Sequence, residues 1–205
     1  MKAIQSLFNL IGGHILPEED DGPATRVRLI LLAGLATTVF AAIYGIAAGS
    51  TDLTLAFSNI YKLPMVILLS SLCAVPAGLL TWKLLGAKQR ATDILMGQAA
   101  GNFTGTLVMA ALSPIVALYY HTSGYLGGTL ALGTCYLGLG VGLLILVRAV
   151  LRRAPEGLSR YEIGLPTAVL IAVQLAAMVQ FIYIASPILP ELTVFDGGMD
   201  AIVAQ

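Results

Sequence analysis

Five long apolar runs are the feature that most constrains what this 205-residue chain can fold into. A helix needs roughly 20 mostly apolar residues to cross the hydrocarbon core of a bilayer. The runs that reach this length are Val27–Gly49, Leu63–Leu85, Ala91–Tyr120, Gly124–Val150 and Ile163–Leu189. None of them shows the polar–apolar alternation that a transmembrane barrel strand requires. The sequence therefore predicts an all-α, polytopic transmembrane helical bundle of about five spans.

The low content of charged residues supports this class. Only 11% of the residues are charged and 58% are hydrophobic, whereas about a quarter of the residues of a soluble domain are charged. Such a chain cannot cover itself with a hydrated surface. The joints between spans are predicted at Ser50–Lys62, Gly86–Arg90, His121–Ser123 and Leu151–Glu162.

The basic residues predict the orientation. With five spans, the N-terminus and the second and fourth joints share one side, which carries every Lys and Arg of the chain except Lys62. The positive-inside rule places this side, and with it the N-terminus, in the cytoplasm and leaves the C-terminus external. We expect a bacterial inner (cytoplasmic) membrane protein. Arg148, Arg152 and Arg153 are expected to contact anionic phospholipid headgroups, and no nucleic acid is needed to explain them.

The two ends of the chain differ from the apolar spans. Residues 1–16 are expected to form an interfacial amphipathic helix, with docking onto a partner subunit or disorder as alternatives. Its apolar residues at helical spacing are Ile4, Leu7, Phe8, Ile11 and Ile15. Residues 17–26 are predicted as an acidic linker, 27–189 as the transmembrane domain and 190–205 as an external tail.

Catalytic chemistry is not expected. An ionisable residue at bilayer depth is a functional candidate, and the predicted spans hold none at mid-depth. Asp93 and Glu162 lie at the starts of spans three and five, where a carboxylate meets the positive end of the helix dipole. Cys73 and Cys135 fall in mid-span as small apolar fillers. With no metal-ligand spacing and no phosphate-binding loop, we expect no catalytic residue, no metal, no cofactor and no enzyme activity.

Small and neutral polar residues recur in the spans instead. Four-residue spacing of glycines lets helices approach closely, and amide side chains can then bond across the contact. The predicted helix-packing residues are Gly97, Gly101, Gly105, Gly128, Gly138 and Gly142. The predicted interhelical polar residues are Gln98, Asn102 and Gln174. The alternative is a polar pathway lined by these amides, with Gln180 as a further member.

One stretch resembles a known family. The segment Tyr61-Lys62-Leu63-Pro64-Met65 through Pro76, then Leu84–Arg90 and the polar opening of the third span, resembles the Yip family of five-span membrane proteins over roughly residues 60–150. The chain departs from that family at the N-terminus, where the long hydrophilic arm and the aromatic-Gly-Pro motif are missing. The resemblance implies a membrane adaptor or scaffold, and it transfers no site residue.

Two classes of function follow from these observations. The first is a non-catalytic scaffold or accessory subunit that packs with other membrane subunits or with a second copy of the chain. It rests on the glycine stripes, the short joints and the scarcity of charge in the spans. The alternative is a small transporter or channel for a neutral solute.

Overall fold

The computed structural model describes residues 2–12, 22–86, 90–153 and 160–190. In chain order the helices are α1 (Lys2–Gly12), α2 (Pro23–Ala48), α3 (Leu53–Leu84), α4 (Ala91–Thr122), α5 (Gly124–Arg152) and α6 (Arg160–Ala185). No strand occurs among the described residues. The prediction of an all-α fold is confirmed.

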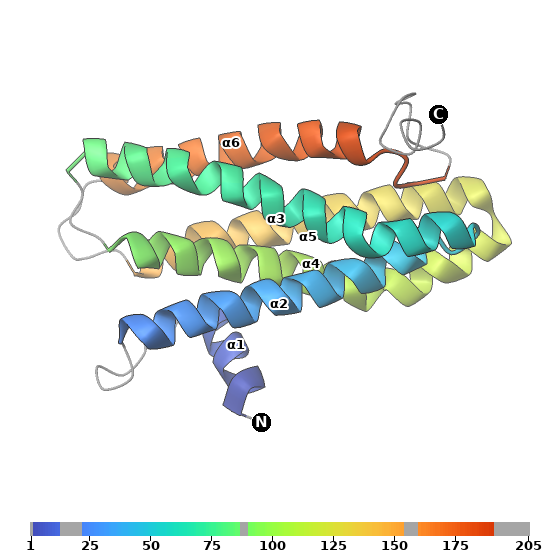
Figure 1. The fold of residues 1–205 in the computed structure, drawn as a ribbon, viewed down its shortest axis with the longest axis horizontal. Coiled ribbons are helices and arrows are strands. Elements are labelled where there is room, and N and C mark those ends of the chain that lie inside the picture. Colours follow the sequence, from blue (N-terminus) through green and yellow to red (C-terminus); the bar gives the residue numbers. More distant parts are fainter. Residues whose placement is uncertain (1, 13–21, 87–89, 154–159, 191–205) are drawn as a thin grey trace.

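Five of these helices, α2 to α6, are long and apolar enough to cross a membrane. They run alternately up and down one common axis (Figure 1). Arg26, Lys83, Arg90 and Arg152 therefore lie at the same end of the bundle, which we call the basic end. The prediction of a polytopic bundle is confirmed, and the chain is an integral membrane protein.

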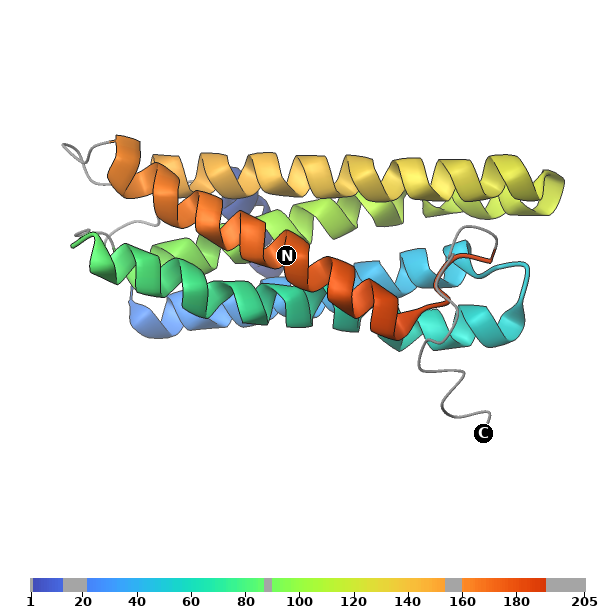
Figure 2. The same ribbon diagram turned by 90° about the horizontal axis from the view of Figure 1, so that it is seen from above.

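The helices α2 to α6 form an incompletely closed ring. α4 packs against both α2 and α5, and α3 packs against both α2 and α6. α5 and α6, the two outer members of this series, have few contacts with each other. They lie together near the basic end and diverge toward the opposite end (Figure 2). Neighbouring helices of the ring thus pack closely, except for α5 and α6.

The start of α3 corrects the sequence prediction. The segment Ser50–Lys62 was expected as a polar joint, but α3 begins at Leu53. The Asp52 carboxylate caps this start by accepting a hydrogen bond from the Thr54 backbone N–H at 2.8 Å, which satisfies a donor that a helix start leaves open. Lys62 therefore lies inside a span and is fully buried. The prediction that it belongs to a polar joint was wrong.

The N-terminal part of the chain packs on the bundle. α1 crosses it near the basic end (Figure 1), and Leu7 and Leu10 are buried in a cluster with residues of α2, α4 and α5. Phe8 is exposed on the other side of α1. α2 begins at Pro23, because proline suits the first turn of a helix, so residues 23–26 of the expected linker are helical. Residues 13–21 and 191–205 of the expected linker and tail lie outside the described residues.

Candidate functional site

Four neutral polar side chains meet inside the bundle. Ser71 comes from α3, Gln98 and Asn102 come from α4, and Gln174 comes from α6. The Gln98 amide Nε2 donates to Gln174 Oε1 at 2.7 Å, and Asn102 Nδ2 donates to Ser71 Oγ at 2.7 Å. The Gln174 amide Nε2 donates to Asn102 Oδ1 at 3.2 Å. The structure thus brings together the three amides that the sequence singled out, and adds Ser71.

This amide cluster leaves one acceptor unused. Gln98 Oε1 has no hydrogen-bond partner among the described residues, and Gln98 is only 4% exposed. The Ser71 hydroxyl cannot supply the missing donor, because its proton is given to the Ile67 carbonyl at 2.8 Å. A buried acceptor without a donor costs about 1–3 kcal/mol. The amide cluster therefore holds one buried acceptor that receives no hydrogen bond from the described residues.

A cavity of about 410 Å³ adjoins the amide cluster. Gln98, Asn102 and Gln174 form part of its wall. Apolar side chains from α3, α4, α5 and α6 form most of the rest, among them Leu63, Val66, Met109, Leu139 and Met178. Its size and its mostly apolar lining with a few convergent polar groups are typical of small-molecule sites. The structure thus holds a ligand-sized cavity at bilayer depth.

The cavity reaches the surface between α5 and α6. Tyr136 on α5 and Val179 on α6 both line it, and they are 66% and 59% exposed. These are the two helices that diverge from each other in Figure 2. Since both are membrane spans, the opening faces the acyl chains of the bilayer rather than water.

Glycines close the ring between α4 and α5. A Cβ added at Gly101 would lie 2.7 Å from the Gly142 carbonyl oxygen, and one added at Gly105 would lie 2.8 Å from the Gly138 carbonyl oxygen. A Cβ at Gly97 would lie 2.9 Å from Val150 Cγ2. The two backbones can approach this closely only because both helices lack a side chain there. Gly128, the remaining glycine of the predicted packing set, is buried in α5.

The segment after α6 covers the cavity at the opposite end. Asn59 Nδ2 donates to the Ile188 carbonyl at 2.8 Å, and Lys62 Nζ donates to the Pro187 carbonyl at 3.2 Å. Ile188 and Leu189 line the cavity. Sequence reasoning missed this cover, because Asn59 and Lys62 were assigned to a joint. The sequence pattern that could have predicted this cover is the pair of polar residues Asn59 and Lys62, three positions apart and next to a long apolar run.

A second wall contact joins α2 to α5. The Tyr44 hydroxyl is 2.6 Å from the Ala131 carbonyl oxygen and 2.7 Å from Thr134 Oγ1. Cys135 Sγ lies 3.4 Å from the same hydroxyl. Tyr44 and Cys135 both line the cavity. Cys135 is therefore a cavity-lining cysteine whose thiol can be followed by chemical labelling without introducing a new cysteine. Cys73, in contrast, is exposed on α3.

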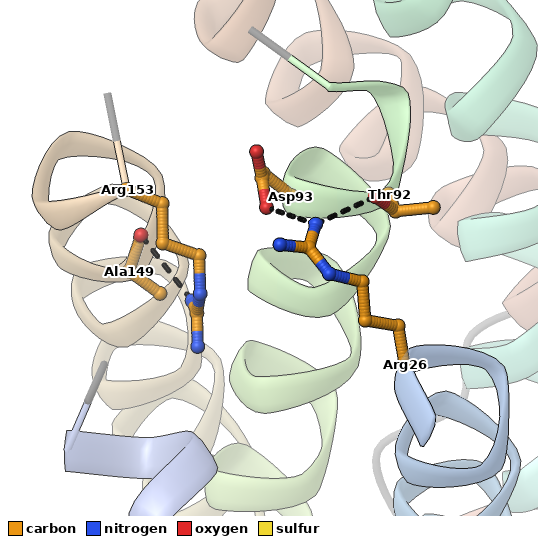
Figure 3. A network of polar contacts seen from close by, with 5 residues as sticks. All are labelled: Arg26, Thr92, Asp93, Ala149 and Arg153. Atoms are coloured by element: carbon orange, nitrogen blue, oxygen red, sulfur yellow. Dashed lines mark hydrogen bonds and ion pairs between the residues drawn. The ribbon is translucent and has the colours of Figure 1, made fainter. Parts of the chain in front are cut away.

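An ion pair links α2 to α4 at the basic end (Figure 3). Arg26 Nη1 lies 2.7 Å from Asp93 Oδ1 and donates to Thr92 Oγ1 at 2.8 Å. Asp93 lies in the first turn of α4, as expected, and is also bound to Arg26. This pair fixes the two helices in register at the membrane edge.

The predicted headgroup residues lie at the end of α5. Arg148 and Arg152 are exposed there, while Arg153 is partly buried and donates to the Ala149 carbonyl at 3.3 Å. Figure 3 shows Arg153, which directly follows α5, in the same view as the Arg26–Asp93 pair.

Metal-ligating side chains do not gather in the part of the chain that the structure describes: no three His, Cys, Asp or Glu residues come together there. No family model, curated protein or solved structure shows significant similarity to the chain. The resemblance to the Yip family stays a prediction.

Proposed function

We propose that this chain is a membrane-embedded binding protein or carrier for a small uncharged molecule, which develops the alternative prediction of a small transporter or channel for a neutral solute. The observation that carries the proposal is the cavity of about 410 Å³ with the amide cluster in its wall. A mostly apolar pocket with a few convergent polar groups is the default binding site of a protein without a known ligand.

The lining favours an uncharged ligand. None of the described residues that line the cavity is an Asp, Glu, Lys, Arg or His. Lys62 lies beside Leu63 but is not part of the lining, and its Nζ is bonded to the Pro187 carbonyl. Burying a charge without a partner is far more costly than burying a neutral polar group. A neutral molecule is therefore the class that this cavity fits.

The scaffold or accessory-subunit function stays a prediction. One of its supports was the glycine stripes of α4 and α5, and these pack the two helices against each other within one chain. They are therefore not free to receive a partner helix. The cytoplasmic placement of the basic end and a bacterial inner membrane are part of the proposal, supported by the exposed Arg148 and Arg152 and the positive-inside rule.

Photolabelling with benzophenone tests the proposed function, because benzophenone is small and uncharged. The protein is placed in lipid nanodiscs and irradiated, and the labelled peptides are mapped by mass spectrometry. We expect saturable labelling of the peptides that carry Met109 and Met178, above the labelling of the lipid-facing peptide with Leu118.

A pair of variants separates the cavity from the lipid surface. Leu139→Trp fills the cavity from α5, whereas Leu137→Trp adds the same ring at an exposed position of α5 that does not line it. Saturable labelling should be lost in Leu139→Trp and kept in Leu137→Trp. Equal labelling of wild type and both variants, with no saturation at Met109 or Met178, would refute the proposed function.

A further inference from the structure

The unpartnered acceptor in the amide cluster defines the polar group that the ligand must carry. Gln98 lines the cavity, and its Oε1 is a buried oxygen to which none of the described residues donates. An oxygen acceptor is satisfied only by an O–H or N–H group. An ether or ester head would bring further acceptors and leave Gln98 Oε1 without a donor. The complementary head is therefore an uncharged hydroxyl or amide.

The shape of the cavity gives the ligand a direction. Gln98 and Asn102 lie in the half of α4 near the basic end, and Met109 lies about 16 Å from Gln98 along the same helix by the rise per residue. Beyond the amides the lining is mostly apolar and ends at Ile188 and Leu189. A molecule with a polar head at Gln98 would extend an apolar tail toward the opposite end.

The cavity's opening points to the bilayer as the source of the ligand. Asn59 and Lys62 hold the segment after α6 over the end opposite the basic end, and the glycine contacts close the α4–α5 side. The exposed lining residues Leu132, Tyr136 and Val179 lie on α5 and α6. A molecule dissolved among the acyl chains meets this opening directly.

From these three observations we propose that the cavity binds a membrane-dissolved amphiphile whose uncharged head donates a hydrogen bond, such as a long-chain alcohol, and admits it laterally between α5 and α6. This inference rests on the proposed function, since it names the class of the uncharged ligand. It assigns Gln98 as the residue that recognises the head.

Competition in nanodiscs tests the inference. The protein is photolabelled with a diazirine derivative of decan-1-ol, and unlabelled decan-1-ol, methyl decyl ether and glycerol compete. We expect decan-1-ol to compete about tenfold more strongly than the ether, the ratio that one added hydrogen bond gives, and glycerol not to compete. Lateral entry further predicts labelled peptides that contain Tyr136 or Val179.

A matched pair of variants locates the recognising group. Gln98→Met keeps a similar chain length and removes the acceptor, whereas Gln180→Met makes the same change at an exposed position of α6. The preference for the alcohol should disappear in Gln98→Met and persist in Gln180→Met. Thermal unfolding checks that both variants are folded, and the alcohol-to-ether ratio in the wild type tests the donor requirement even if Gln98→Met does not fold.

The outcomes separate this inference from the proposed function. Equal competition by alcohol and ether, with benzophenone still labelling Met109 and Met178, would overturn the donor requirement and leave an uncharged ligand in place. Competition by glycerol but not by decan-1-ol would overturn the amphiphile and its lateral entry. Loss of saturable benzophenone labelling would overturn the proposed function itself.

Discussion

Gln98 on α4 donates to Gln174 on α6 across 2.7 Å, although each of these helices packs mainly against other neighbours. The bond crosses the interior of the ring and ties α6 to α4. Without it, α6 would be held chiefly by α3. The same amides form the polar wall of the cavity. One hydrogen bond therefore contributes both to the architecture and to the candidate site.

The first prediction concerns this bond. Gln174→Leu removes the acceptor of Gln98 Nε2 and the donor to Asn102, and interhelical hydrogen bonds of this kind contribute about 1 kcal/mol in membranes. We expect the free energy of unfolding to fall by about that amount, measured by denaturant titration in detergent micelles. Gln180→Leu, on the exposed side of α6, is the matched control. Equal stability of the two variants would show that the amide cluster does not hold α6.

The second prediction uses the glycines of α4 and α5. Gly101→Ala would place a Cβ 2.7 Å from the Gly142 carbonyl oxygen, so we expect a loss of about 1–3 kcal/mol by overpacking. Gly140→Ala is expected to raise the free energy of unfolding instead. Nothing lies within 4 Å of its added Cβ, and alanine favours a helix over glycine by up to about 1 kcal/mol. Thermal unfolding of both variants measures the difference. The close α4–α5 contact would be contradicted if Gly101→Ala were as stable as Gly140→Ala.

The third prediction concerns the buried ion pair at the basic end (Figure 3). Asp93→Leu leaves the Arg26 guanidinium without its carboxylate, and removing one partner of a buried pair costs about 3–5 kcal/mol. Replacing both partners, as in Arg26→Met with Asp93→Leu, should recover most of that loss, since no charge stays buried. Denaturant titration of the wild type, the single variant and the double variant gives the comparison. If the double variant were no more stable than Asp93→Leu, the loss would not come from the unpaired charge.

The five spans could be predicted from the sequence because span length and hydropathy are local properties. The glycines and amides of α4 could also be found, since their four-residue spacing puts each set on one face. The start of α3 could not, because it depends on the Asp52 cap and on the burial of Lys62. The partner of Lys62 at Pro187 is 125 residues away in the chain.

The cavity could not be predicted for a related reason. It exists because the ring of helices is not closed by close packing between α5 and α6, and no sequence pattern reports which two spans fail to pack. The docking of α1 on the bundle could not be predicted either. Helical spacing indicated an apolar face, but the choice of Leu7 and Leu10 as its buried residues depends on the surfaces of α2, α4 and α5.

The fourth prediction tests the orientation. If the basic end faces the cytoplasm, a cysteine introduced at exposed Arg152 should react only with reagents supplied from the cytoplasmic side. A cysteine at exposed Thr122, at the other end of α4, should react only from outside. Both cysteines are introduced into a variant that lacks Cys73 and Cys135. Labelling of intact cells and of inverted vesicles with a membrane-impermeant maleimide then shows from which side of the membrane each cysteine reacts. The reverse pattern would place the N-terminus outside.

The last prediction concerns the cover at the end opposite the basic end. Asn59 Nδ2 holds the Ile188 carbonyl at 2.8 Å, and Ile188 forms part of the cavity lining. Asn59→Ala removes that bond, so we expect the segment after α6 to open more often and to admit water to the cavity. Cys135 reports this change, because its thiol lies in the cavity wall. In a Cys73→Ala background, a membrane-impermeant maleimide should label Cys135 several-fold faster in Asn59→Ala than in Ser58→Ala. Ser58 is the matched control, since its hydroxyl donates to the Leu55 carbonyl of its own helix. Equal labelling rates in the two variants would mean that Asn59 does not hold the cover closed.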